Sequence, residues 1–156
     1  MLLFLSLISC DTPFMCTEMG CGSTAPIRIE SAGDSLQEGT YSFRIDGDEE
    51  TLADCQVRMS MDTEECAGEQ PCAAESTCNA IYATNAITFT ISPGATEYVV
   101  SVSLEYQDEN DSIQNIDFDH RTFTPEYNEF RPNGEGCDPV CLTPKEELTV
   151  TLSDGF

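Results

Sequence analysis

The sequence predicts an all-β protein, an antiparallel β-sandwich of immunoglobulin-like or similar type, with about seven strands and long disulfide-stapled loops. Three observations predict this fold. Apolar residues recur at every second position in short segments, turn-forming residues separate these segments, and cysteines gather in the stretches between them. Alternation at period two is typical of a strand with one buried face, and short strands at regular spacing are typical of sandwiches.

The predicted strands follow one another along the chain. Tyr41, Phe43 and Ile45 alternate with polar residues in one early segment, and the apolar residues at even positions from Tyr98 to Leu104 form one face of a later segment. Asp, Asn, Gly and Pro favour tight or left-handed turns, and they separate the segments. The seven segments are 27–31, 40–46, 52–61, 86–92, 97–107, 112–123 and 147–152. Because the chain has no Trp, a true immunoglobulin domain with its Cys…Trp…Cys spacing is not predicted.

An apolar run, residues 2–9, opens the chain and is followed at once by Cys10 and a polar segment. The run is far shorter than the roughly 20 residues that span a membrane, and it fits the apolar part of a secretory signal. Leu7-Ile8-Ser9-Cys10 resembles the bacterial lipobox, in which the cysteine is lipidated and begins the mature protein. The resemblance implies a signal peptide at 1–9, a lipidated Cys10 with a tether over 10–25, and a single sandwich domain over 26–156. It also implies a lipid-anchored location in the bacterial cell envelope.

The cysteines indicate disulfides. Of nine cysteines, the lipobox takes Cys10, and the other eight form an even set. An exported chain meets an oxidising compartment, so four disulfides are expected. There is no Cys-x-x-Cys pair and only one histidine, so a zinc site is not predicted. The eight are Cys16, Cys21, Cys55, Cys66, Cys72, Cys78, Cys137 and Cys141.

Two connections, 62–85 and 124–146, are too long to be simple hairpins, and they contain five of the cysteines. Long loops in compact domains are usually functional or held down. If the strands alternate in direction, the tether and the second connection open at the same end of the sandwich. The candidate pairs are then Cys16 and Cys21 with Cys137 and Cys141, and Cys55 with one of Cys66, Cys72 and Cys78. The exact connectivity stays open.

The chain is strongly acidic. Acidic residues outnumber basic ones 29 to 6, which gives a formal net charge of −23. Nucleic acid and bare anionic lipid carry the same sign of charge and are excluded as direct partners. The charge favours solubility on a crowded surface, a basic protein partner, or Ca²⁺.

Three short motifs resemble those of GDSL-type lipases and esterases. Gly33-Asp34-Ser35-Leu36 is similar to the nucleophile block of that family, Asn110-Asp111 is similar to its Asn-Asp block, and Asp117-Phe118-Asp119-His120 matches its Asp-x-x-His block. The resemblance implies Ser35 as nucleophile, His120 as general base, Asp117 as its orienting acid and Asn110 as an oxyanion donor. That family has an α/β fold in which many residues separate the Asn-Asp block from the Asp-x-x-His block, whereas in this sequence the two blocks are close together. A turn at 33–35 and a strand edge at His120 therefore explain these residues as well.

Acidic turns are candidate calcium sites. The segment 108–111 resembles the Asp-x-Asn-Asp linker of cadherins, and the segment 46–50 gathers oxygen ligands of the kind that Ca²⁺ prefers. The candidate ligands are Asp46, Asp48, Asp108 and Asp111. In so acidic a chain, such runs are also typical of solvated turns. No other cofactor is predicted.

The segment from Phe123 to Cys141 resembles the ending of short, acidic, cysteine-rich bacterial lipoproteins. Its prolines and its Asn-Gly pair predict a rigid surface loop. Such a loop is either a staple over one end of the sandwich or a platform that presents Tyr127, Phe130 and Arg131 to a partner.

The leading functional hypothesis is a membrane-anchored, non-catalytic envelope or cell-surface lipoprotein that acts as a binding module. A small GDSL-like esterase that uses Ser35 and His120 is the alternative from the enzyme class. A calcium-dependent adhesion domain is the third hypothesis.

Overall fold

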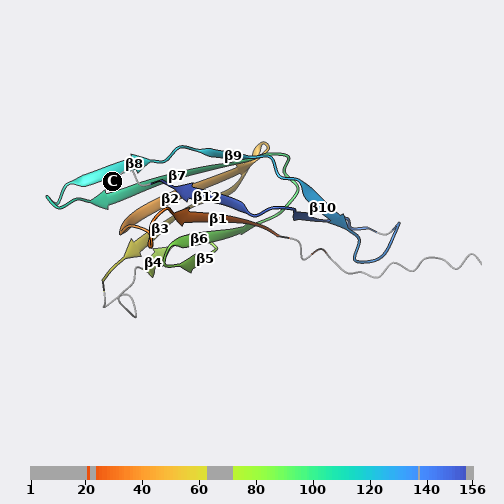
Figure 1. Cartoon of the computed structure of the whole chain (residues 1–156), viewed down its shortest axis with the longest axis horizontal. Coiled ribbons are helices and arrows are strands. Elements are labelled where there is room, and N and C mark those ends of the chain that lie inside the picture. Colours follow the sequence, from red (N-terminus) through yellow and green to blue (C-terminus); the bar gives the residue numbers. More distant parts are fainter. Residues whose placement is uncertain (1–20, 22–23, 63–71, 137, 154–156) are drawn as a thin grey trace, which may run out of the picture.

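The computed structural model describes residues 21, 24–62, 72–136 and 138–153. Within these residues the chain forms twelve strands and no helix, which confirms the predicted all-β class (Figure 1). The strands are β1 (Ala25–Ser31), β2 (Gly39–Gly47), β3 (Glu50–Ser60), β4 (Cys72–Ser76), β5 (Ala80–Ala83), β6 (Ala86–Ile91), β7 (Tyr98–Gln107), β8 (Ile113–Asp117), β9 (Arg121–Phe123), β10 (Tyr127–Phe130), β11 (Cys141–Pro144) and β12 (Leu148–Leu152).

The strands form two packed sheets and a separate hairpin. The smaller sheet has the order β12-β1-β6-β5, and the larger has the order β4-β3-β2-β7-β8, with β9 also on β7. The strands β10 and β11 pair only with each other. Neighbours are antiparallel except β1 and β12, which run parallel from Ile27 opposite Leu148 to Ser31 opposite Leu152. The antiparallel sandwich is therefore confirmed, with one parallel pair that joins its first and last strands.

The core lies between the inner faces of the two sheets. On β7, Tyr98, Val100, Val102 and Leu104 are buried, as their alternation predicts. The Phe43 ring of the larger sheet meets the Phe89 ring of the smaller sheet, with ring centroids 5.2 Å apart. Burial of such side chains is worth about 1.5–3 kcal/mol each. The alternation thus decides which face of each strand turns inward.

The strand predicted at 112–123 is interrupted. It forms β8 and β9, both paired with β7, and between them the register moves by one residue. Phe118 and Phe123 lie five residues apart, so a continuous strand would place them on opposite faces of the sheet. One extra residue at 118–120 forms a β-bulge, and both rings pack against the core. The prediction of one continuous strand was wrong for this reason.

The two long connections are not structureless. The first contains β4 and β5, and the second contains the hairpin β10–β11, so the count of about seven strands was too low. These four strands are four or five residues long and lack a clear alternation of apolar residues. Pairing with neighbours and disulfide bonds hold them, rather than a buried face of their own.

The parallel pair β1–β12 sets the two ends of the sandwich. The chain enters β1 beside the hairpin β10–β11, so the tether and the second connection open at the same end, as predicted. Ala25, the last residue of the predicted tether, already belongs to β1 and is fully buried. At the opposite end lie the loop 32–38, the turn 108–112 and the end of β12 (Figure 1). We call this the distal end.

Two disulfides agree with the predicted pairing groups. Cys21 is bonded to Cys141, which ties the tether to the hairpin, with 120 residues of sequence separation. Cys55 is bonded to Cys78, which ties the first long connection to β3, with a separation of 23 residues. Cys72 is disulfide-bonded as well. Cys10, Cys16, Cys66 and Cys137 lie outside the described residues.

We expect the eight cysteines beyond Cys10 to be oxidised, with each disulfide adding to stability. In the chain-entropy model, closing loops of these lengths contributes about 3 to 5 kcal/mol each. A Cys55→Ala, Cys78→Ala double variant and a Cys21→Ala, Cys141→Ala double variant should therefore both melt well below the wild type. Melting should be followed by circular dichroism.

The oxidation state is checked by intact mass after alkylation without reductant, on protein exported to its native compartment. No alkyl groups should be taken up by the eight cysteines. Uptake of two or more would show that the count of four bonds is wrong.

Candidate functional site

The loop 32–38 closes the distal end through backbone hydrogen bonds to neighbouring elements. The Ala32 amide donates to the Leu152 carbonyl at 3.0 Å, and the Leu36 amide donates to the Thr84 carbonyl at 3.0 Å. The Gly33 amide donates to the Ser31 side chain at 3.0 Å, which tightens the turn. The Leu36 side chain is buried in the core. These contacts fix the loop across the space between the two sheets.

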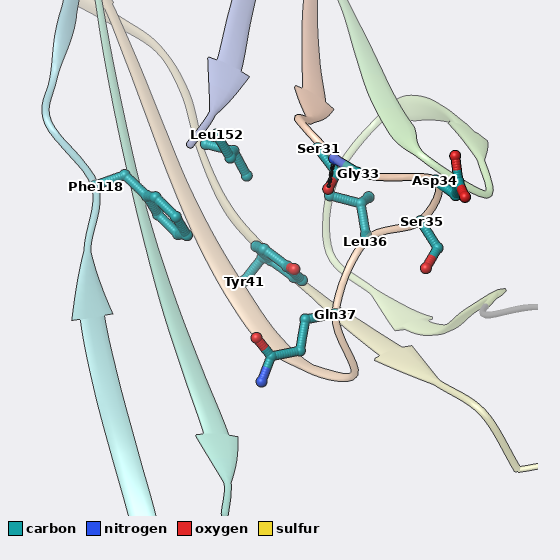
Figure 2. Close-up of a pocket in the computed structure, with 9 residues that line it drawn as sticks. All are labelled: Ser31, Gly33, Asp34, Ser35, Leu36, Gln37, Tyr41, Phe118 and Leu152. Carbon is teal, nitrogen blue, oxygen red and sulfur yellow. Dashed lines mark hydrogen bonds between the residues drawn. The ribbon is translucent and has the colours of Figure 1, made fainter. Parts of the chain in front are cut away.

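A cavity of about 490 Å³ lies beside this loop. Leu152 reaches it from the smaller sheet, Tyr41 from the larger sheet, Phe118 from the bulge and Leu36 from the loop. Figure 2 shows these apolar side chains around the cavity, with Asp34 and Ser35 on the far side of Leu36 from Phe118. Burial raises the pKa of Tyr41 to about 12, while a hydrogen bond with the backbone of Gln37 acts in the opposite direction. Tyr41 is therefore neutral at physiological pH.

Gln37 supplies an unused acceptor to this cavity. Its Oε1 atom is buried and accepts no hydrogen bond from the described residues. Figure 2 shows Oε1 on the side of Gln37 that faces Phe118 and Tyr41, and Nε2 on the opposite side. A buried acceptor without a donor costs about 1–3 kcal/mol of desolvation. Gln37 therefore carries an unsatisfied acceptor beside the cavity.

An acidic groove of about 640 Å³ adjoins the cavity and shares Gln37 with it. The carboxylates of Glu38, Glu105, Asp108 and Asp111 line it. The one basic residue that lines it is Arg58, whose Nε atom lies 3.8 Å from Oε2 of Glu75 in an ion pair. The groove and the cavity together give the distal end a negative rim around an apolar centre.

The structure does not assemble the esterase residues. Ser35 is exposed on the loop beside the first cavity, whereas Asp117 and His120 line another hollow, beside outward-facing residues of β2 and β7. No hydrogen bond joins Ser35 to His120 in the described part of the chain. Asn110 lies in the turn 108–112, where its backbone amide donates a hydrogen bond to Oδ1 of Asp108 at 2.9 Å. Ser35 and His120 thus line different hollows, which share Phe118.

The calcium candidates at 46–48 stabilise the turn between β2 and β3. Asp46 accepts hydrogen bonds from Arg44 at 2.8 Å and from Thr51 at 2.6 Å. Asp48 adopts a left-handed conformation with φ of 51° and accepts hydrogen bonds from the Thr96 hydroxyl at 2.6 Å and the Thr96 amide at 3.0 Å. These bonds lower the pKa of both carboxyls. The largest effect on Asp46 comes from its hydrogen bond with Arg44, and the largest effect on Asp48 comes from its hydrogen bond with Thr96.

The calcium candidates at 108–111 stabilise the turn between β7 and β8. Asp108 accepts from the Ser112 amide at 3.0 Å and from Gln114 at 2.8 Å, and these bonds together with that from Asn110 lower its pKa. Asp111 has a φ of 59° and accepts from Gln107 at 3.3 Å. Across the residues that the structure describes, no group of three or more His, Cys, Asp or Glu side chains is arranged to hold a metal ion.

The predicted binding residues of the hairpin differ in exposure. The Tyr127 hydroxyl bonds to the Ala95 carbonyl and to the Tyr98 hydroxyl, both at 3.0 Å, so its role is structural. Phe130 is 49% exposed, and Arg131 lies 3.6 Å from Asp138 in an ion pair. Of these three side chains, Phe130 is the one that offers free apolar surface.

Comparison with protein-family models, with curated protein sequences and with solved structures gave no match. In the described ranges, the chain has no helix long and apolar enough to cross a membrane.

Sequence reasoning did not identify the distal cavity. Gln37, Tyr41, Phe118 and Leu152 come from four separate segments, and three of them look like ordinary core residues. The odd spacing of Phe118 and Phe123 was the available signal, because it breaks the period-two pattern and indicates a bulge. A bulge often reorients a side chain next to a site.

We expect Asp48→Ala to lower the melting temperature by several degrees and Asp48→Asn to lower it less. Ala loses the bonds to Thr96 and tolerates the left-handed φ poorly, whereas Asn tolerates this φ and keeps one acceptor. Because folding lowers the pKa of Asp48, its charge contributes stability above the ordinary value of 3.8, and this contribution falls as pH drops. The gap between wild type and Asp48→Asn should therefore narrow from pH 6 towards pH 3, as measured by calorimetry. A gap that widens on acidification would contradict this assignment.

Proposed function

We propose that the protein is a membrane-anchored, non-catalytic lipoprotein of the bacterial cell envelope that binds a basic protein partner through its distal end. The lipid on Cys10 would hold it at the membrane, because residues 2–9 are too short to span the bilayer. The observation that carries the proposal is the placement of the distal cavity and groove at the end of the sandwich opposite the entry of the chain.

The arrangement of the tether supports this orientation. The disulfide Cys21–Cys141 fastens the chain to the hairpin just before β1 begins, at the end of the sandwich opposite the distal end. From there β1 runs towards the distal end, and β12 runs beside it in the same direction. An anchor on Cys10 would therefore point the distal end away from the membrane.

The charge distribution supports a basic partner. Five of the six basic side chains already form ion pairs within the chain. Most of the 29 acidic side chains therefore have no basic counterpart in the protein. An oppositely charged partner gains attraction over the Debye length of about 8 Å at physiological salt. The paired basic residues are Arg28, Arg44, Arg58, Arg131 and Lys145.

We expect Cys10→Ala to abolish membrane attachment, since the lipid supplies the anchor that the short apolar run cannot. After expression of the full chain in a bacterial host, the wild type should enter the detergent phase in Triton X-114 partitioning. The variant should appear as an unprocessed or soluble precursor. Ser6→Ala, within the apolar run but outside the lipobox, is the matched control and should behave as the wild type. Equal partitioning of wild type and Cys10→Ala would overturn the anchoring.

We expect no hydrolysis of p-nitrophenyl acetate beyond the background rate, because Ser35 and His120 lie in different hollows. Ser35→Ala and His120→Ala should each match the wild type in this assay. Turnover by the wild type that disappears in both variants would replace the proposal with the esterase.

A further inference from the structure

We propose that the distal cavity binds a lysine or arginine side chain from a basic segment of the partner protein. This inference rests on the proposed function and specifies its recognition site. Three independent features of the cavity support it: its apolar lining, the unused acceptor on Gln37, and the acidic rim.

The lining suits the aliphatic stem of a long basic side chain. Leu36 and Leu152 supply aliphatic surface, and Tyr41 and Phe118 supply aromatic rings. Lysine and arginine bury their methylene stems against apolar surface and keep the charged head group near polar atoms. A cation beside an aromatic ring is stabilised further, and arginine makes such contacts most often. A cavity of about 490 Å³ leaves room for one such side chain.

Gln37 supplies the polar end of the site. Its Oε1 atom lacks a donor among the described residues and lies on the side of Gln37 that faces Phe118 and Tyr41, where it is covered, so the side-chain amide must turn towards the cavity to meet a ligand. Ammonium and guanidinium groups are donors without acceptors, so either would satisfy this oxygen. A neutral apolar group would fill the cavity but leave Oε1 unpaired, and a carboxylate would present another acceptor. The orphan acceptor therefore favours a basic side chain over an acyl chain or an acid.

The rim adds the complementary charge. Asp34 lines the cavity itself and is exposed, and Glu38 and Glu105 line the adjoining groove. That groove keeps a net negative charge, because four carboxylates line it against the single guanidinium of Arg58. Phe118 continues the register of β8 and lies on the same inner face as Ile116, and the bulge that follows it returns Phe123 to that face as well.

The test uses the full, disulfide-bonded chain and acetylated hexa-arginine amide as the probe. Hexa-citrulline, which has the same shape without the charge, is the control peptide. Binding is measured by fluorescence anisotropy, and the side-chain amide of Gln37 is followed by nitrogen-15 NMR. Hexa-arginine should bind and shift the Gln37 side-chain signal, whereas hexa-citrulline should do neither.

Two pairs of variants separate the cavity from general electrostatics. Gln37→Met keeps the side-chain length and removes the acceptor, so it should weaken binding about tenfold, because a hydrogen bond to a charged group is lost. Gln56→Met on β3 is its matched control. Asp34→Asn removes one rim charge and should weaken binding by about threefold, whereas Glu129→Gln on the hairpin should change it by less than about twofold. Asp34 is exposed, so its variant tests the site even if Gln37→Met fails to fold.

Each outcome bears on a different claim. Weaker binding by Gln37→Met and Asp34→Asn, with both control variants unchanged, supports the cavity as the site. Equal effects of Asp34→Asn and Glu129→Gln, with no shift of the Gln37 signal, would overturn the cavity while leaving a basic partner for the acidic surface. Failure of the wild type to bind hexa-arginine would also overturn the cavity inference, and the anchoring would still be decided by the Cys10→Ala partitioning.

Discussion

The parallel pairing of β1 with β12 is the constraint on which the rest of the structure depends. It joins the first and last strands of the domain, so the smaller sheet is complete only when nearly the whole chain has been ordered. Contacts between residues so far apart in sequence cost loop-closure entropy before they contribute stability. The disulfide Cys21–Cys141 links the same two regions of the chain and offsets part of that cost.

The acidic residues divide into two groups with different physical roles. Asp48 and Asp108 accept hydrogen bonds from backbone amides at tight turns, and Asp46 accepts them from the side chains of Arg44 and Thr51. Their charges are used within the fold, and their lowered pKa values record this. Asp34 and Glu105 have no such partners among the described residues. A count of acidic residues in the sequence cannot separate these groups, because the difference lies in which amides the turns bring close.

The sequence predicted the parts of the fold that a buried face determines. The inward side chains of β2 and β7 follow from alternation alone, because moving a strand by one residue would expose its apolar side chains. The four short strands of the long connections could not be predicted this way, since pairing and disulfides hold them. Of the candidate sites, the predicted cysteine groups agree with the two disulfides Cys21–Cys141 and Cys55–Cys78. The distal cavity was not predicted, because the residues that form it with Gln37 include Phe118 and Leu152, which are distant in sequence.

The bulge at 118–120 also affects how copies of the molecule meet. β8 and β9 form an outer edge of the larger sheet, and a long, regular edge is a template for pairing with the edge of another copy. The bulge interrupts the spacing of amides and carbonyls along this edge, and Asp117 and Asp119 add negative charge beside the interruption. The bulge that brings Phe118 and Phe123 to the same face therefore also opposes the growth of intermolecular sheets along this edge.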